Sequence, residues 1–448
     1  MNSQDELNTT IKALVQDRKG ILAADESVPT ISKRFKAVGI ESTEETRRAY
    51  RELLLTAPGI GEFISGVILF EETLGQKAAD GTLLIEVAQR AGIVPGIKVD
   101  KGTIALANAP GDMVTQGLDG LAERLAHYKI QGARFAKWRE IYPITPTNPT
   151  RLGMTANAEV LARYAAICQE QGIVPIVEPE VLIDGEHSIE RCAEVTEAVL
   201  SEVFTALCRH RVSLERMLLK PNMIVPGKAH QPKSPAHDVA RMTIEVFRRV
   251  VPAAVPSINF LSGGLSPEDA SSYLNAMNAL YPHAPWALSF SYARALQEPA
   301  MAAWRGLAEN VGAAQHAFCE RARCNSAARC GQYGDAIQPP VTKGVAPLPE
   351  LDENGLLKDP GTWNESVASA LAAQSGLGEL TEDHWKIIRA LREYYGKFGV
   401  APAMNQVCHA YGRDWRWAHD LFHTCLGAWR VAGLPDPGEE AKSYLNDM

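Results

Sequence analysis

One lysine stands where its amine could attack a carbonyl carbon. Lys220 follows the apolar run Met217–Leu219 and precedes a proline, so we expect its side chain to be desolvated. A desolvated lysine near a second cation loses its proton more readily and becomes a nucleophile. Lys137 and Arg139 are the candidates for that second cation. The alternative is ordinary, because a lone lysine at the end of an apolar run is usually solvated.

Three carboxylates could move the protons that such chemistry requires. Glu178 and Glu180 flank a proline inside one apolar run, and the two-residue period of a strand places both on one face. One could shuttle a proton while the other orients a lysine. Asp25 follows two alanines, so it could be a base that reaches a substrate unhindered. The alternatives are that the glutamates form ordinary salt bridges and that Asp25 caps a helix that starts after Ser27.

Two segments containing Gly and Ser suggest that the ligand carries phosphate. Ser262-Gly263-Gly264 and Ser291-Tyr292-Ala293-Arg294 each follow an apolar run, and loops of this kind hold phosphate through backbone N–H groups. Arg294 would add a charge-assisted hydrogen bond. A Gly-Gly pair alone is more often just a turn. A second polar and cationic set lies on other loops and consists of Ser27, Thr30, Arg34 and Lys98. Two such sets predict two phosphate sites and therefore a bis-phosphorylated substrate. The alternative for Lys98 is a local ion pair with Asp100.

Eight short apolar runs must position these groups. They alternate with amphipathic stretches such as 158–171 and 188–209, which predicts strands buried on both faces of a parallel sheet. Eight such units within about 300 residues predict a closed (β/α)8 barrel. Each run is apolar first and polar last, so the polar ends would open on the catalytic face of the barrel. The runs are 20–26, 66–71, 96–100, 133–139, 174–180, 217–222, 257–263 and 287–292.

The pattern changes after about residue 330. Gly and Pro without a hydrophobic period predict a linker, and the segment beyond it has helical periodicity. We therefore expect residues 1–333 to form the barrel, 334–347 a linker and 348–448 a small, mainly helical domain. The expected elements of that domain are a turn at 353–355, helices from Thr362 to about 373 and from Thr381 to about 398, and further helix from 404 to 432.

The composition excludes several classes of protein. The chain has 448 residues, 46% of them hydrophobic and 22% charged, which is ordinary for a globular protein. A net charge of −8 argues against nucleic acid as the main partner. We find no apolar run that could span a membrane and no secretory signal. Cys319, Cys324 and Cys330 near His316 could hold a metal, but scattered reduced thiols are the simpler interpretation.

Seven blocks follow one another between residues 5 and 333 in a specific order. They are ILAADES at 21–27, IKVDKG at 97–102, FAKWR at 135–139, VEPE at 177–180, LLKPNM at 218–223, FLSGG at 260–264 and FSY at 290–292. In this set and order the chain resembles the class I fructose-1,6-bisphosphate aldolases. The resemblance implies an α/β fold with a TIM barrel, and a lyase of glycolysis and gluconeogenesis that uses neither metal nor cofactor. It would cleave fructose 1,6-bisphosphate reversibly to dihydroxyacetone phosphate and glyceraldehyde 3-phosphate.

The resemblance also implies a role for each candidate residue. Lys220 would form a Schiff base with the ketose carbonyl, Glu178 would be the acid and base, and Asp25 would take the C4 hydroxyl proton. Lys137 would stabilise charge and help Lys220 to lose its proton, and Glu180 would orient these groups. The C1 phosphate would be bound by the loop of Ser262, Gly263 and Gly264 with Ser291 and Arg294, and the far phosphate and hydroxyls by Ser27, Thr30, Arg34, Lys98 and Arg139.

The sequence departs from the family pattern in two places. Ala293 stands where the family has glycine before the phosphate arginine; because a backbone N–H remains, we expect a modest effect. The family-like region ends near Tyr333, and the flexible terminal tyrosine of the animal enzymes has no clear counterpart. The family is commonly tetrameric, which implies a homo-oligomer. We expect a cytoplasmic protein that binds sugar phosphates and neither nucleic acid nor membrane.

The C-terminal segment resembles the DsrC/TusE sulfur-relay proteins. The matching residues are LDENGL at 351–356, WNE at 363–365, LTEDHW at 380–385, YY at 394–395, APA at 401–403 and AGLP at 432–435. Those proteins carry sulfur on a cysteine near the C-terminus, and redox-active members have a second cysteine upstream. Here Trp429 stands where the upstream thiol would be, and Glu439-Glu440 replaces the terminal region. We therefore expect a docking or regulatory module in which Cys408 and Cys425 are buried helix residues.

Two functions remain open at this point. The first is a Schiff-base aldolase, and all the catalytic residue types that it needs are present. The alternative is a scaffold or regulatory binding protein whose DsrC-like module recruits a protein partner from sulfur metabolism. The sequence does not decide between fructose 1,6-bisphosphate, fructose 1-phosphate and sedoheptulose 1,7-bisphosphate as substrates.

Overall fold

The structure is a computed structural model that describes residues 3–334, 351–352, 355–375, 377, 380–414, 416–438 and 441. The chain divides into two compact units, Met1–Pro339 and Pro340–Met448. The linker predicted at 334–347 lies outside the described residues except for Gly334. The boundaries at 333 and 348 therefore stay predictions.

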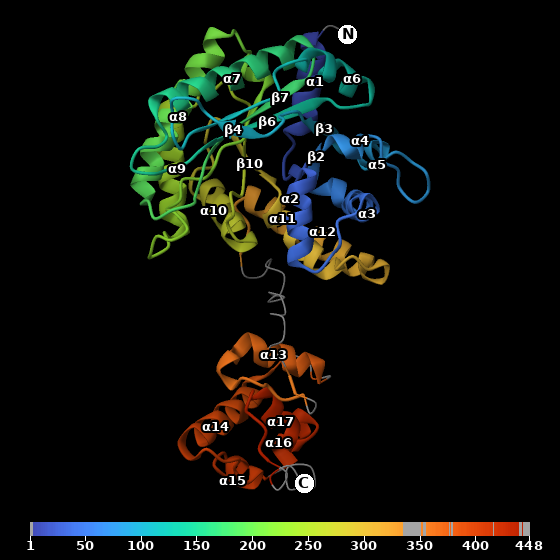
Figure 1. The fold of residues 1–448 in the computed structure, drawn as a ribbon, viewed down its shortest axis with the longest axis vertical. Coiled ribbons are helices and arrows are strands. Elements are labelled where there is room, and N and C mark those ends of the chain that lie inside the picture. The colour runs from blue at the N-terminus through green and yellow to red at the C-terminus, as the bar shows by residue number, and fades with distance from the viewer. Residues whose placement is uncertain are drawn as a thin grey trace. The chain divides into compact units, whose positions relative to one another are not determined.

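Eight parallel strands of the first unit close into a barrel, as predicted (Figure 1). Around the barrel they follow in the order β1, β10, β9, β8, β7, β6, β3 and β2, so that strands next to each other along the chain also pair. Each predicted run overlaps one of them. The strands are β1 (Gly20–Ala24), β2 (Ile64–Leu69), β3 (Val94–Lys98), β6 (Phe135–Tyr142), β7 (Val174–Val181), β8 (Leu218–Leu219), β9 (Ser257–Phe260) and β10 (Ala287–Tyr292).

A helix follows each barrel strand along the chain, which is the repeating unit of this architecture. The helix predicted at 158–171 begins earlier, at Arg151, because the Thr150 side chain accepts the N–H of Gly153 and caps it there. The helices of this unit are α1 (Ser3–Leu14), α2 (Val28–Ala37), α3 (Glu44–Leu55), α4 (Glu71–Leu74), α5 (Leu84–Arg90), α6 (Leu121–Ile130), α7 (Arg151–Glu170), α8 (Ile189–Arg209), α9 (Ala236–Val250), α10 (Pro267–Leu280), α11 (Arg294–Trp304) and α12 (Val311–Arg329).

An antiparallel pair outside the barrel was not predicted. It consists of β4 (Thr103–Ala105) and β5 (Met113–Thr115). All three residues of β4 are exposed, so the pair carries no alternation of apolar and polar side chains that a sequence pattern could reveal.

Inward-facing side chains near the start of the strands form an apolar plug inside the barrel. Gly96 of β3 makes room for it, because a Cβ there would lie 2.3 Å from the ring of Phe135. Side chains alternate along a strand, so the next inward positions beyond the plug are the predicted catalytic ones. The plug consists of Ile21, Ala23, Ile68, Phe135, Val174, Ile176 and Leu218, with Leu7, Ile11 and Leu14 of α1.

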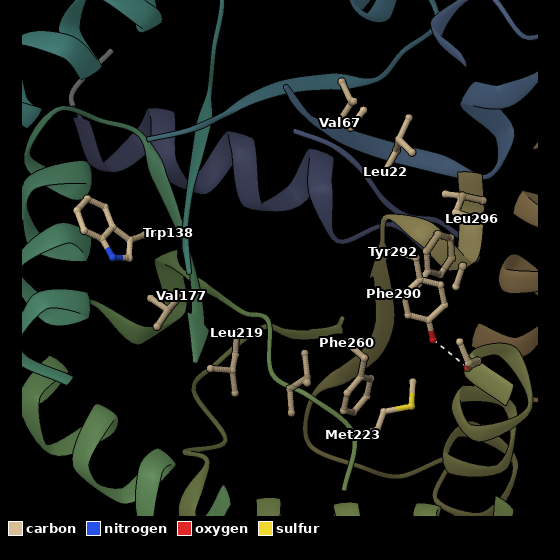
Figure 2. Close-up of a cluster of buried hydrophobic side chains, with 14 of the residues drawn as sticks. Leu22, Val67, Trp138, Val177, Leu219, Met223, Phe260, Phe290, Tyr292 and Leu296 are labelled. Carbon is tan, nitrogen blue, oxygen red and sulfur yellow. Dashed lines mark hydrogen bonds between the residues drawn. The ribbon is translucent and has the colours of Figure 1, made fainter. Parts of the chain in front are cut away.

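Outward-facing side chains form the larger core between strands and helices. Figure 2 shows Trp138, Val177 and Leu219 of three consecutive barrel strands in this core. Trp138 also packs against Tyr164 of α7, with ring centroids 5.4 Å apart. The Tyr292 hydroxyl donates to the Ala270 carbonyl at 2.9 Å, which ties β10 to α10. This packing fixes the strands, and with them the inward neighbours of these residues.

The second unit is helical, as predicted. Thr381 is the N-cap of α14 (Glu382–Phe398), and an antiparallel bridge joins Leu351 to Leu357. Of the turn predicted at 353–355, residues 353 and 354 lie outside the described residues. Its core includes Leu371, Ile388 and Trp429. The helices are α13 (Glu365–Gln374), α14 (Glu382–Phe398), α15 (Met404–His409), α16 (Arg416–Phe422) and α17 (Cys425–Val431). In the part of the chain that the structure describes, no helix of either unit has the length and apolarity needed to cross a bilayer.

Candidate active site

The inward positions beyond the plug open into a cavity of about 640 Å³ at the carboxyl ends of the strands. The alternation that turns Ile21 and Ala23 into the barrel also turns Asp25 inward, and the same holds for Phe135 and Lys137. This single cavity is lined by every residue predicted for catalysis or phosphate binding: Asp25, Ser27, Thr30, Arg34, Lys98, Lys137, Arg139, Glu178, Glu180, Lys220, Ser262, Gly263, Gly264, Ser291 and Arg294.

Lys220 lies directly after β8 and reaches the cavity beside Glu178. Its backbone N–H donates to the Val177 carbonyl at 2.8 Å, which continues the pairing of β8 with β7. Its Nζ lies 3.1 Å from Oε1 of Glu178, and the two side chains are only 4% and 5% exposed. The solvated alternative for Lys220 is therefore wrong. An amine held against a buried carboxylate can exchange protons with it during attack on a carbonyl.

Lys137 links the carboxylates of the site. Its Nζ lies 2.8 Å from Oδ2 of Asp25, 3.2 Å from Oε2 of Glu178 and 3.9 Å from Oδ2 of Asp100. Burial alone would lower the pKa of Lys137, but these carboxylates outweigh it and raise that pKa above its usual value. Lys137 is thus a permanent positive charge between two groups that could exchange protons with a substrate.

Asp25 faces the cavity as an ionised carboxylate. Burial alone would raise its pKa, but Lys137, Lys220 and Lys98 hold the pKa of Asp25 well below its usual range. An ionised carboxylate at the cavity wall can accept a hydroxyl proton. Asp25 does not cap a helix: the N-cap of α2 is Ser27, whose side chain makes no capping hydrogen bond.

Glu180 lies at the next inward position of β7, on the same face as Glu178, as the two-residue period predicted. Its carboxylate accepts a hydrogen bond from Nε of Arg139. Burial would lower the pKa of Arg139, but Glu180 outweighs it and raises that pKa. What Glu180 holds in place in the structure is therefore a guanidinium at the wall of the cavity.

The loops after β9 and β10 form the first predicted phosphate site. Gly263 and Gly264 have φ values of +52° and +94°, a region that favours glycine. Oγ of Ser291 is buried and has no hydrogen-bond partner among the described residues, so a ligand could use it. Ala293 has a negative φ of −102°, so the backbone there is not in the left-handed region that would require glycine.

The residues predicted for the far phosphate already have partners within the protein. Arg34 donates to the carboxylate of Glu26. Nζ of Lys98 lies 2.6 Å from Oδ1 of Asp100, so the local pair foreseen as an alternative is present. The hydroxyls of Ser27 and Thr30 lie 3.1 Å apart. A phosphate bound here would share its cations with carboxylates.

Glu26 is a site residue that the sequence reasoning did not assign. Its carboxylate contacts Arg34, lies 2.6 Å from Nη2 of Arg51 and accepts a hydrogen bond of 2.9 Å from Nε2 of Gln297. It thereby joins β1 to α2, α3 and α11 and fixes Arg34. Its place beside Asp25 was the only signal. Lys33, which also lines the cavity, was missed as well.

In the C-terminal unit, an indole is buried at the position where the resemblance placed the upstream thiol. Trp429 is fully buried, its Nε1 donates to the Pro435 carbonyl at 2.9 Å, and its ring meets Tyr395 edge-on. Cys408 and Cys425 are fully buried too, which confirms that prediction. Burial raises the pKa of the Cys425 thiol to about 11 and also raises that of Cys408, so neither is a ready nucleophile. Glu439-Glu440 lies outside the described residues.

Comparisons with known proteins follow the same division. The family model "Fructose-bisphosphate aldolase class-I" matches residues 6–344, and "DsrC like protein" matches residues 347–439. The chain is 54% identical over 319 residues to the cytosolic fructose-bisphosphate aldolase 4 of Arabidopsis thaliana, which covers 71% of this chain and 81% of that protein. It is 53% identical over 338 residues to the fructose-bisphosphate aldolase of Dictyostelium discoideum, with 74% and 94% covered. A solved structure of fructose-bisphosphate aldolase from Plasmodium falciparum, in complex with TRAP and a small-molecule inhibitor, superposes with a TM-score of 0.73 at 51% identity and covers 74% of this chain and 96% of that one.

Proposed function

The chain belongs to the class I fructose-bisphosphate aldolases, and we propose that it cleaves fructose 1,6-bisphosphate reversibly through a Schiff base on Lys220. The observation that carries the proposal is the 3.1 Å contact between Nζ of Lys220 and Oε1 of Glu178, two buried side chains at the wall of the cavity. The amine condenses with the C2 ketone, and water leaves the carbinolamine as Glu178 donates and takes up protons.

Cleavage of the C3–C4 bond needs a base on one side and an electron sink on the other. Asp25 accepts the proton of the C4 hydroxyl, the C4 oxygen becomes the aldehyde, and the electrons of the C3–C4 bond pass to the iminium nitrogen. Glyceraldehyde 3-phosphate leaves, and an enamine stays on Lys220. Protonation at C3 and hydrolysis then release dihydroxyacetone phosphate. Lys137 offsets the negative charge as the carboxylates change protonation state.

The two ends of the cavity would hold the two phosphates. The free Ser291 hydroxyl and the glycine loop after β9 support the C1 phosphate site, together with Arg294. Arg34, Lys98 and the Ser27 and Thr30 hydroxyls support the far site, where Glu26 and Asp100 already hold the cations in position. Because Glu180 holds Arg139, we propose that it orients this guanidinium toward the substrate.

A cleavage assay tests this function directly. The purified chain should turn over fructose 1,6-bisphosphate, with fructose 1-phosphate and sedoheptulose 1,7-bisphosphate measured beside it to establish preference. Activity should persist in excess EDTA, because the proposed electron sink is a protonated imine. Absence of turnover on all three sugars, or complete loss of it in EDTA, would refute the proposal.

We also propose that the protein is a cytoplasmic homo-oligomer, as the family resemblance implies. The Arabidopsis relative is named cytosolic, and a relative from Spinacia oleracea at 53% identity is named a cytoplasmic isozyme. Light scattering on the full chain tests the oligomer: a mass several times the 48.8 kDa of one chain is expected, and a monomer would contradict it.

For the C-terminal unit we propose docking of a protein partner in place of sulfur transfer. The support is that Trp429 stands where the resemblance places the upstream thiol and that Cys408 and Cys425 are buried with raised pKa values. Incubation of the full chain with cysteine persulfide should leave both thiols unmodified by mass spectrometry. A persulfide on either residue would favour sulfur relay.

A further inference from the structure

Two cations from separate loops converge on one glycine at the phosphate end of the cavity. A Cβ built on Gly264 would lie 2.9 Å from Nζ of Lys228 and 2.9 Å from Nη2 of Arg294. Nζ of Lys228 and Nη2 of Arg294 therefore lie no farther from each other than twice this 2.9 Å distance. Only a residue without a side chain leaves room for both, and the φ of +94° at Gly264 also favours glycine.

The lysine reaches this point from the loop that follows Lys220 along the chain. Its backbone is held on both sides, because the N–H of Lys228 donates to the Ile183 carbonyl at 2.8 Å and that of Gly227 donates to the His187 carbonyl at 2.8 Å. These hydrogen bonds fix the backbone from which the Lys228 side chain extends to Gly264. The backbone at Lys228 is therefore held in place by the fold.

The charges around this pair are not balanced. Among the residues that the structure describes, Lys228 pairs with one carboxylate, whose Oδ1 on Asp184 lies 3.3 Å away. Both side chains are well exposed, which makes that contact weak. Among the described residues, no carboxylate lies within ion-pair distance of Arg294. Two like charges brought together over a glycine repel each other, and a dianion placed between them removes the repulsion.

We propose that Lys228 is a second cation of the C1 phosphate site and a specificity-determining residue for a phosphate at C1. The proposal rests on the function proposed above, which places that phosphate on the glycine loop and Arg294. It extends the site to a residue that neither the sequence motifs nor the lining of the cavity includes. The ligand class is a phosphate monoester, and the lysine acts on it as a point charge while the arginine supplies a fork.

The condensation direction separates the two phosphate sites, because only dihydroxyacetone phosphate carries the C1 phosphate. With Lys228→Met, the KM for dihydroxyacetone phosphate should rise roughly 3- to 10-fold, as expected for a partly exposed ionic contact. The KM for glyceraldehyde 3-phosphate should stay within about two-fold. Lys228→Arg keeps the charge and should restore the parental value.

The matched control is Lys233→Met on the same loop, where the lysine is 72% exposed and pairs with Asp269 at 3.2 Å. It should change neither KM. An unchanged KM for dihydroxyacetone phosphate in Lys228→Met, or an equal rise for both substrates, would overturn the proposal. If the parent chain shows no turnover, the proposed function fails. The role of Lys228 can then still be tested by calorimetric titration of the parent and of Lys228→Met with dihydroxyacetone phosphate. The proposal predicts that the variant binds this compound more weakly than the parent does.

Discussion

The two units of this chain bury opposite kinds of side chain. In the mouth of the barrel, Lys137, Glu178 and Lys220 are each no more than 5% exposed and lie in direct ionic contact. In the C-terminal unit the indole of Trp429 is fully buried in an apolar core. Burying charges costs desolvation free energy that apolar packing does not, so a protein without a use for the barrel cluster would be as stable with apolar residues there.

This difference shows what a family resemblance conveys. Both units resemble known families, and both fold as the resemblance implies. The barrel gathers the side chains that the resemblance assigns to the family's chemistry in one cavity. In the helical unit, Trp429 stands where the resemblance places a thiol. Function follows the groups in the site and not the fold that carries them.

The largest expected effect comes from removing the nucleophile of the barrel. Lys220→Met should reduce turnover of fructose 1,6-bisphosphate by about 10⁴-fold or more, because no other step can substitute for the covalent intermediate. Thermal unfolding measured beside it should show a folded protein, since Glu178 keeps its contact with Lys137. If the variant cleaves the sugar as fast as the parent, Lys220 is not the nucleophile, and the buried charges of the barrel do not have the catalytic role proposed here.

A smaller loss is expected when the base is neutralised. Asp25→Asn should lower kcat by roughly 10²- to 10⁴-fold. The depressed pKa of Asp25 means that its ion pair stabilises the fold above the pKa of about 3.9 in the unfolded chain and is lost only as the pH falls through the lower folded value. The pH–rate profile of the variant should therefore run parallel to that of the parent from pH 5 to 9. A shift of the acid limb would contradict this assignment.

In the C-terminal unit a core substitution should change stability and leave catalysis alone. Trp429→Ala should destabilise this unit by about 3–5 kcal/mol, the range for a large buried aromatic. Calorimetry of the full chain would detect the earlier transition. Trp417→Ala, at a partly exposed position, is the control and should cost much less. If Trp429→Ala lowered kcat/KM for the sugar more than two-fold, the two units would be coupled, and the contrast between them would be less complete.

The smallest effect concerns a barrel carboxylate held by neutral donors. Glu140 accepts hydrogen bonds from Nε1 of Trp138 and the N–H of Thr115, and burial raises its pKa to about 7. The folded state therefore binds a proton that the unfolded chain releases above about pH 4, and stability falls as the pH rises from about 4 to 7. Between pH 5 and pH 8, the free energy of unfolding of Glu140→Gln should rise by about 1–3 kcal/mol relative to that of the parent, as measured by urea unfolding. An equal difference at both pH values would show that Glu140 does not titrate in this way.

Much of the barrel was predictable because its pattern is local. Each apolar run marked a strand, and the two-residue period placed Glu178 and Glu180 on one face. The polar ends of the runs placed Asp25 and Lys137 in the mouth. The β4–β5 pair gave no signal because its first strand is wholly exposed.

The pair of Lys98 with Asp100 was foreseen because it is local, but the distant partners of the cations were not predictable. Arg34 pairs with Glu26, which in turn meets Arg51 and Gln297 from distant segments. Such contacts depend on how the barrel closes and on how the helices pack against it. The spacing of residues in the sequence reveals neither. The same holds for Lys228 and Arg294, which meet over Gly264 only in the folded chain.

The central claim is that the amine of Lys220 forms the covalent bond to the sugar. The most direct measurement is reduction of the full chain with borohydride in the presence of fructose 1,6-bisphosphate, followed by peptide mass spectrometry. We expect one reduced adduct of the ketose on the peptide that contains Lys220, and none without the sugar. An adduct on Lys137 or Lys228 alone, or none from a chain that actively cleaves the sugar, would contradict it.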